Sequence, residues 1–451
     1  MKAWQNHRLG DVVDEGGGSI QTGPFGSQLH ASDYVAEGIP CIMPANMKNN
    51  RVDVSGIARI SEHDANRLKR HIVKTGDIVY SRRGDITQKA LIRENENGFF
   101  CGTGCLLLRP GKKIDPAFLT YYLSTKTYQL WIASQAVGAT MPNLNTGILN
   151  RVSFCAPDKD DQERIASVLT ALDAKIELNN RINAELEGMA KLLYDYWFVQ
   201  FDFPMSASQA AALGKPHLTG HPYRASGGKM NYNKTLKREI PEGWSDQSIS
   251  CMIASDKAGD WGEETAIGNY QTEVYCLRGT DINSLNGNGT TTPPKRFILR
   301  KNEFKLLKPN DLIIEISGGS PTQSTGRASA LLKPVFARFD KPLICSNFCK
   351  ALSLKLDTSI FYFYRTWAGL YDAGVFFNWE GKTSGIKNLL FDSFVNNHRV
   401  VNPDKEITRQ FDEILTPFEK IKQANLIQNQ ELTQLRDWLL PMLMNGQVTV
   451  N

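Results

Sequence analysis

Residues 161–197 read DQERIASVLTALDAKIELNNRINAELEGMAKLLYDYW, and the seven-residue period of their apolar side chains decides the fold. Residues 407–443 read ITRQFDEILTPFEKIKQANLIQNQELTQLRDWLLPML and repeat this pattern. The two stretches predict long helices over 157–203 and 403–446, the first closed by Pro204 and the second by Pro441 with Gly446. At ~1.5 Å per residue, nearly 40 residues make a rod of roughly 55–60 Å.

One line of side chains along each helix forms the predicted seam of an antiparallel coiled coil. In the first helix this line consists of Ile165, Leu169, Leu172, Ile176, Asn179, Asn183, Leu186 and Leu193. In the second helix it consists of Phe411, Leu415, Phe418, Asn425, Asn429, Leu432 and Leu439. In an antiparallel pair the four asparagines would meet in one layer, which costs stability but fixes the register. The alternative is two separate helices whose asparagines face water.

The chain also repeats itself outside the helices. Residues 73–79 (VKTGDIV) resemble residues 307–313 (LKPNDLI), residues 40–47 match 275–282, and the order of the matches is the same in both halves. Short strands bounded by Gly, Asn and Pro alternate irregularly with helices, which predicts an α+β fold with a pseudo-twofold internal duplication. We expect similar domains over 1–156 and 239–402, joined by an exposed linker rich in Ala, Gly, Ser and Pro over 204–238.

The net charge of +5 is divided unevenly along the chain. Residues 1–156 carry +5 and residues 205–402 carry +7, whereas the helical segments 157–204 and 403–451 carry −5 and −2. Basic domains favour a polyanion, because each phosphate that a Lys or Arg neutralises releases counterions. Charge that serves only solubility explains the same numbers equally well.

Sequence motifs for catalysis are missing. There is no G-x-x-x-x-G-K-[ST] phosphate loop, and Asn402-Pro403-Asp404 lacks the second proline and the aromatic residue of an amino-methyltransferase loop. Acidic clusters lie where helix N-terminal acids belong, and the eight cysteines resemble small buried hydrophobes, so we expect no metal. Without an apolar run of 18 residues or a signal peptide, we expect a cytoplasmic protein with no membrane partner.

Several loops combine backbone freedom with side chains that suit base edges and phosphates. The candidate DNA-binding residues of the first domain are Phe25, Ser27, Gln28, Asn46, Lys48, Arg82, Arg83, Gln88, Lys89, Thr140 and Asn143. Those of the second domain are Lys257, Trp261, Arg278, Thr280, Asp281, Gln323, Ser324, Arg327, Lys382 and Thr383. For any single residue, ordinary loop polarity is the competing interpretation. As a set they favour double-stranded DNA as the partner.

Motifs along nearly the whole chain resemble the specificity subunit of type I restriction-modification enzymes. They are Gly23-Pro24-Phe25-Gly26-Ser27, Gly138 to Leu144, Asp161 to Ile165, Tyr196 to Val199, Ser226 to Met230 and Ile240 to Trp244. The second domain departs from strict repetition, because Asp256 to Gly262 replaces the Gly-Pro-Phe-Gly-Ser loop. The half-sites read by the two domains should therefore differ.

This resemblance implies a non-catalytic subunit whose two target-recognition domains each read one half of a bipartite DNA site. The helix pair would set the gap between the halves. Two methyltransferase (modification) subunits would bring S-adenosylmethionine and N6-adenine methylation, and two restriction/translocase subunits would bring ATP and Mg. No cofactor is expected in this chain.

Two alternatives remain open at this point. One is the target-recognition part of a fused endonuclease-methyltransferase, and the other is a helical scaffold whose basic domains bind protein or RNA. A second apolar line on the helices, which includes Ile414, Ile421 and Leu435, indicates either partner helices or burial against the chain's own domains.

Overall fold

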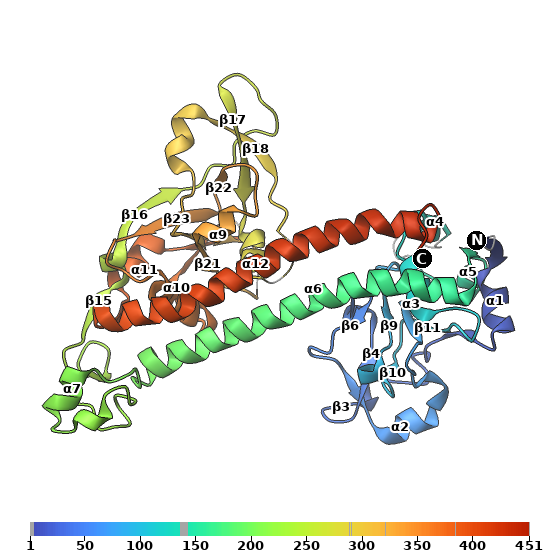
Figure 1. Cartoon of the computed structure of the whole chain (residues 1–451), viewed down its shortest axis with the longest axis horizontal. Coiled ribbons are helices and arrows are strands. Elements are labelled where there is room, and N and C mark those ends of the chain that lie inside the picture. The colour runs from blue at the N-terminus through green and yellow to red at the C-terminus, as the bar shows by residue number, and fades with distance from the viewer. Residues whose placement is uncertain are drawn as a thin grey trace. The chain divides into compact units, whose positions relative to one another are not determined.

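The structure is a computed structural model that describes residues 4–135, 143–287, 289, 291–320, 322–383 and 385–450. The chain forms two compact units, one made of Met1–Ile176 and Glu431–Asn451 and the other of Glu177–Gln430. Each unit contains one mixed domain together with parts of two long helices (Figure 1).

The first mixed domain contains two four-stranded sheets. One sheet is antiparallel with the order β2-β11-β8-β9, and the other has the order β10-β4-β7-β3 with β10 parallel to β4. The strands are β2 (Ser19–Thr22), β3 (Tyr34–Val35), β4 (Ile39–Ile42), β7 (Arg59–Ile60), β8 (Ile78–Ser81), β9 (Lys89–Leu91), β10 (Phe100–Cys101) and β11 (Cys105–Arg109). Strand β1 (Gln5–Arg8) pairs with β12 (Ser153–Ala156), and α1 (Leu9–Glu15), α3 (Pro116–Tyr122), α4 (Lys126–Gln135) and α5 (Thr146–Asn150) complete the domain.

The second mixed domain repeats this topology. Its antiparallel sheet has the order β16-β23-β19-β21, and its second sheet has the order β18-β17-β22 with β17 parallel to β22. These strands are β16 (Ile253–Ala258), β17 (Tyr270–Leu277), β18 (Lys295–Leu299), β19 (Asp311–Glu315), β21 (Ala328–Leu331), β22 (Leu343–Cys345) and β23 (Cys349–Leu354). The domain adds the sheet β20 (Ser317–Gly318), β25 (Ile386–Leu389) and β24 (Glu380–Thr383), while β15 (Ser245–Ser248) pairs with β26 (Arg399–Asn402).

The two antiparallel sheets have matching strand orders, whereas the second sheet has four strands in the first domain and three in the second. Cys105 pairs with Ser81 in the first domain, and Cys349 pairs with Glu315 in the second, so each pair occupies the same place in its sheet. Helix α10 (Ile360–Asp372) follows β23 as α3 follows β11. The predicted α+β duplication is therefore confirmed by hydrogen-bond register as well as by sequence.

The two long helices follow their domains as the heptads predict. Helix α6 spans Lys159–Tyr194 and continues into a π-helical turn at Asp195–Val199, and α12 spans Lys405–Met444. The predicted close of the second helix at Pro441 with Gly446 lies near the observed end, since α12 ends at Met444 with Pro441 inside its last turn and Gly446 follows in a left-handed conformation. A proline near a helix end removes one backbone hydrogen bond without ending the remaining turn.

Within each unit α6 and α12 run antiparallel. In one unit Arg436 contacts Asp173, and in the other Lys422 contacts Glu187. All predicted seam residues are buried or half-buried. The asparagine layer forms as predicted, since Asn179 donates to the side-chain oxygen of Asn429 at 2.9 Å and Asn425 donates to that of Asn183 at 2.9 Å.

The segment 204–238 differs from the expected exposed linker. It contains α7 (Ala207–Ala212) and strand β13 (Met230–Asn233), which pairs with β14 (Arg238–Pro241). Met205, Ala210 and Tyr223 are buried in the same core as Phe203. Small and polar residues suggested solvent exposure, but a few apolar residues are enough to fold the segment against the helix end.

The cysteines were predicted to be small buried residues, and four of them form two pairs with the same spacing. Cys101 ends β10 and Cys105 begins β11, so a turn separates them, and Cys345 and Cys349 stand at the equivalent ends of β22 and β23. All four are buried as predicted. Among the described residues, no helix is long and apolar enough to cross a membrane.

Candidate nucleic-acid interface

Each domain presents a loop directly after the edge strand of its antiparallel sheet. The loop begins with Gly23 after β2 and with Gly259 after β16. A Cβ atom on Gly23 would lie 2.3 Å from the carbonyl oxygen of Gly102, and one on Gly259 would lie 1.9 Å from that of Ser346. Both positions require glycine because two backbones approach closely there.

This shared glycine aligns two loops that the sequence comparison treated as different. Gly23-Pro24-Phe25-Gly26 falls on Gly259-Asp260-Trp261-Gly262, which places Phe25 and Trp261 at equivalent positions. Both aromatic side chains are exposed, Phe25 by 50% and Trp261 by 36%. The guanidinium carbon of Arg82 lies 5.8 Å from the Phe25 ring centroid, and that of Arg296 lies 4.2 Å from the Trp261 ring centroid.

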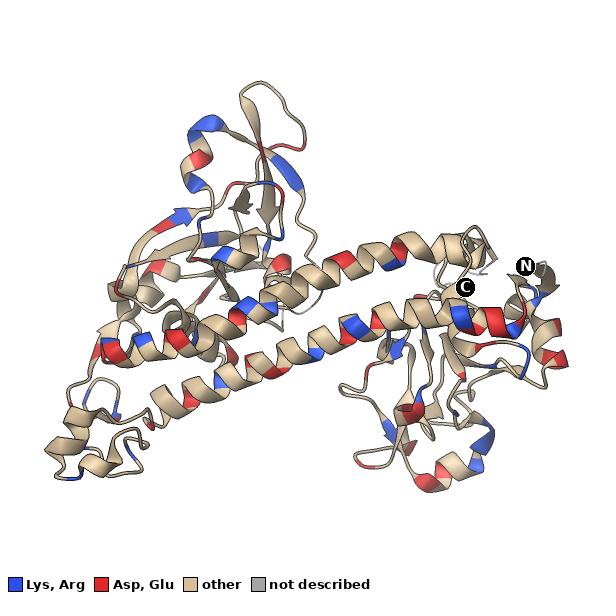
Figure 2. Cartoon of the chain, viewed as in Figure 1, with Lys and Arg blue, Asp and Glu red and all other residues tan. Residues whose placement is uncertain are grey.

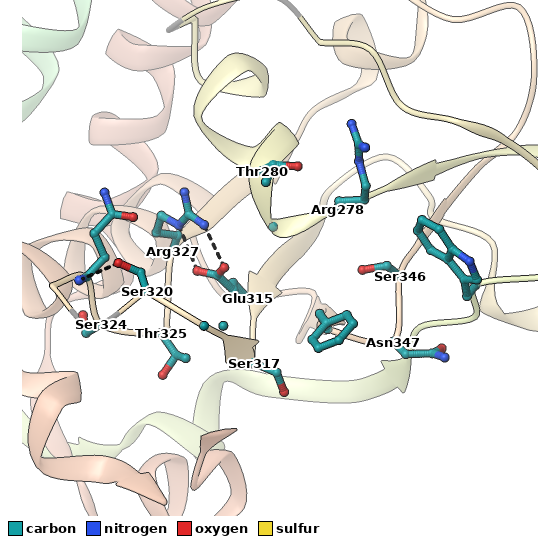
Figure 3. Close-up of a pocket in the computed structure, with 16 residues that line it drawn as sticks. Arg278, Thr280, Glu315, Ser317, Ser320, Ser324, Thr325, Arg327, Ser346 and Asn347 are labelled. Carbon is teal, nitrogen blue, oxygen red and sulfur yellow. Dashed lines mark hydrogen bonds and ion pairs between the residues drawn. The ribbon is translucent and has the colours of Figure 1, made fainter. Parts of the chain in front are cut away.

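In the second domain Trp261 lines an open pocket of about 740 Å³. Besides Trp261, the pocket brings together five residues that the sequence analysis selected: Arg278, Thr280, Gln323, Ser324 and Arg327. Figure 3 shows the Arg327 guanidinium directed at the Glu315 carboxylate, while the Arg278 side chain points away from that pair. Trp261 and Arg327, which are about 65 residues apart in the sequence, therefore lie at the same pocket.

The base of this pocket is a buried ion pair. Arg327 donates two hydrogen bonds to the Glu315 carboxylate, at 2.8 and 2.7 Å, and these bonds raise the pKa of the arginine. A Cβ atom on Gly279 would lie 2.6 Å from a Glu315 carboxylate oxygen, so glycine at this position leaves room for the pair. The Nε and Nη2 edge of the guanidinium is engaged by Glu315, which makes this edge of Arg327 part of the pocket wall rather than a free donor.

Two other candidates cap equivalent turns. Asn46 accepts a hydrogen bond from the Met43 backbone N–H at 3.0 Å, and Asp281 accepts one from the Arg278 backbone N–H at 2.9 Å. Both caps are buried, so these two candidates stabilise turns and do not present free side chains. The Asp281 carboxylate also accepts from the Arg278 guanidinium and thereby fixes that side chain at the pocket rim.

Further candidates have internal partners. Lys89 is only 2% exposed, with its ammonium 5.9 Å from the Tyr80 ring centroid, and burial lowers its pKa to about 7. Lys257 forms a 3.0 Å ion pair with Asp311, and Ser324 is buried. Lys89 and Lys257 belong to strands β9 and β16, so their side chains are covered or paired and are not free donors.

The remaining first-domain candidates lie near the glycine loop or on neighbouring turns. Arg82 donates to the Asn143 side-chain oxygen at 3.3 Å, and Gln28 accepts from the Phe25 backbone N–H at 3.1 Å. Ser27 and Arg83 are exposed. Gln88 donates to Asp85 at 2.9 Å, and Lys48 forms a 2.6 Å ion pair with Asp53. Thr140 lies outside the described residues. In the second domain the candidates Lys382 and Thr383 belong to β24.

Sequence reasoning missed two further residues that line the pocket. Asn347 and Phe348 form the turn between β22 and β23, and Phe348 is 51% exposed. The Cys-x-x-x-Cys spacing could have identified this turn, because the two cysteines flank it in both domains. Glu315 was missed as well, because its role depends on an arginine 12 residues away across the sheet.

The charges do not form a catalytic cluster in the part of the chain that the structure describes. There, no group of three or more His, Cys, Asp or Glu residues is arranged to hold a metal ion. Figure 2 shows Lys, Arg, Asp and Glu interspersed along α6 and α12.

Comparisons with known proteins agree with this architecture. The family model described as "Type I restriction modification DNA specificity domain" matches residues 1–188. The HindI specificity subunit of Haemophilus influenzae is 26% identical over 99% of this chain and 100% of that protein. The MjaIX specificity subunit of Methanocaldococcus jannaschii is 22% identical over 100% of this chain and 94% of that protein. The crystal structure of the type I S subunit from M. genitalium shares the fold, with a TM-score of 0.57, 14% identity and coverage of 98% and 96%.

Duplicated α+β domains on antiparallel helices, together with these matches, define a class of DNA sequence-recognition proteins. Residues 1–188 match the type I restriction-modification DNA specificity domain, and along its whole length the chain is similar to specificity subunits of type I restriction enzymes. The predicted resemblance to that family is confirmed by these matches.

Proposed function

We propose that the two domains read the two halves of a bipartite DNA sequence, each through the surface around its glycine loop. The observation that supports this proposal is that equivalent backbone positions of the two domains carry different polar and apolar side chains. At three equivalent positions the first domain has Met43, Ser81 and Gln88 where the second has Arg278, Glu315 and Arg327. A common frame with different donors and acceptors suits two different half-sites.

We further propose that the helices dock two modification subunits, and that two restriction subunits complete the assembly. Apolar side chains outside the seam support helix-mediated docking, since isolated exposed apolar residues are common but a line of them along a helix is not. The exposed residues are Leu178, Met189, Leu192, Ile414, Ile421, Leu435 and Trp438. S-adenosylmethionine, ATP and Mg would be bound by those partners, and adenine would be the methylated base.

The test is a methyl-transfer assay with labelled S-adenosylmethionine and host DNA whose motif has been determined by methylome sequencing. The purified chain alone should transfer no methyl group, and the chain mixed with its modification subunits should methylate only that motif. Transfer by the purified chain alone would instead support a fused enzyme acting in cis. Methylation without sequence preference in the full mixture would contradict the proposal.

A further inference from the structure

Phe25 and Trp261 stand at the same point of the duplicated frame, although the surrounding loop sequences differ. We propose that each is a stacking residue that places one ring face against a nucleobase of its own half-site. This inference rests on the proposed function and adds the mode of contact.

Exposure of these rings is the first argument. Phe25 is flanked by exposed Gly26 and Ser27, and Trp261 opens onto a pocket lined largely by Ser, Thr, Gly and Arg. Water solvates a large aromatic side chain poorly, so a loop that keeps one exposed in both copies has a use for its surface. The residue type differs between the copies, but the aromatic character is the same.

Both loops also hold the ring before any ligand arrives. The starting glycines Gly23 and Gly259 press against neighbouring backbone, as described above. Beyond them, Gln28 accepts from the Phe25 backbone N–H at 3.1 Å, and Asp260 accepts from the Gly262 backbone N–H at 3.1 Å. A ring fixed in this way loses little conformational freedom on binding, which favours stacking.

A guanidinium group lies over each ring. Arg296, which is itself buried, covers the Trp261 indole at 4.2 Å, and Arg82 lies 5.8 Å from the Phe25 centroid. Trp261 also lines the pocket, together with Phe348 and with polar residues such as Thr280 and Gln323. A cation at the ring and a pocket that combines apolar surface with polar groups suit a nucleobase, which combines a π face with hydrogen-bonding edges near phosphate.

Stacking has a distinctive consequence for specificity. In a duplex both faces of a base are covered by its neighbours, so the ring needs a base step that opens or a base that turns out of the helix. Every base then offers a π face, so a stacking residue adds affinity with little base preference, whereas polar pocket residues discriminate between bases. Loss of either ring should therefore weaken binding without changing the recognised sequence. An apolar partner-protein contact at the same rings would leave DNA affinity unchanged.

The experiment uses the complex of the full chain with its modification subunits and a duplex that carries the methylated motif. Phe25→Ala and Trp261→Ala should each lower duplex affinity by roughly 10- to 100-fold, and the methylated motif should stay the same. Phe25→Trp and Trp261→Phe should retain affinity within about threefold, because they keep the π face. Phe304→Ala is the matched control, since Phe304 is 66% exposed but lies outside the pocket lining.

A second readout locates the contact itself. Duplexes with 5-iodouracil or 5-iodocytosine at pyrimidine positions should photo-crosslink to Phe25 or Trp261, as identified by mass spectrometry. Unchanged affinity in both alanine variants, crosslinks confined to other residues, or an altered methylated motif would overturn the inference. Failure of the wild-type complex to bind its motif would instead refute the proposed function itself.

Discussion

The asparagine layer of the helix pair gives a prediction whose magnitude follows from the structure. Asn183 is 4% exposed, and its side-chain oxygen accepts the Asn425 amide hydrogen at 2.9 Å. Asn183→Leu removes this acceptor and leaves the Asn425 amide in the seam without it. Leaving a buried polar group unsatisfied costs about 1–3 kcal/mol, and the half-buried position of Asn425 favours the lower part of that range.

Replacing both partners should behave differently from replacing one. In the double variant Asn183→Leu with Asn425→Leu, neither amide remains and two leucines extend the apolar seam, so the stability cost should largely disappear. We therefore expect a coupling free energy of about 1–2 kcal/mol between the two sites. The double variant should also specify helix register less strictly, because the polar layer penalises misaligned pairings.

Hydrogen exchange of the α6 amides at residues 177–190 measures the opening free energy of this segment directly. Wild type, both single variants and the double variant complete the cycle. Ala184→Leu with Ala424→Leu is the control, because both alanines are exposed on the same helices. If the opening free energy lost in the double variant equals the sum of the losses in the two single variants to within about 0.5 kcal/mol, the reasoning is refuted.

Three further predictions concern the domains. Gly259→Ala should lower DNA affinity by more than about tenfold in a titration, because its Cβ would lie 1.9 Å from a carbonyl oxygen. Gly369→Ala should not, because its Cβ meets no atom within 4 Å and the residue lies in α10, outside the pocket lining. Glu315→Gln should destabilise the second domain by about 2–4 kcal/mol, measured by hydrogen exchange, because it leaves the partly buried Arg327 guanidinium without a negatively charged partner. An unchanged exchange pattern would count against this. In the folded protein the pKa of Lys89 is about 7, below its usual value, so the buried ammonium destabilises the fold fully below that pH and progressively less above it. Lys89→Met should therefore stabilise the first domain more at about pH 6 than at about pH 10 in thermal melts. An equal gain at both pH values would contradict a buried charge at Lys89.

The helix pair could be predicted almost completely from the sequence, because a coiled-coil seam is set by contacts that recur every seven residues. Leu169 and Phe411 are buried and the asparagines meet in register, as the heptads indicate. The helix end was less predictable. Pro441 stays inside α12 because tertiary packing, including buried Leu443, supports the last turn.

The recognition surface was predicted only in part. Loop composition selected Trp261 and Arg278, which the structure brings into one pocket. It also selected Lys89 and Lys257, whose burial or pairing depends on strands and partners distant in sequence. Composition shows that a side chain is polar, but not whether a neighbouring strand covers it.

The alignment of the two loops was missed for a related reason. By residue identity, Gly-Pro-Phe-Gly and Gly-Asp-Trp-Gly do not align clearly, since only the two glycines are shared. Their equivalence is set by strand register and by the carbonyl oxygens of Gly102 and Ser346 that exclude a Cβ atom. Such constraints lie about 80 residues away along the chain.

Methylome sequencing of cells that carry one changed domain tests the central claim most directly. Arg278→Ala with Gln323→Ala alters the exposed rim of the second-domain pocket and leaves the first domain untouched. We predict that the methylated motif changes or relaxes in one half only, while the other half and the gap stay the same. A motif altered in both halves would contradict the claim that each domain reads its own half-site.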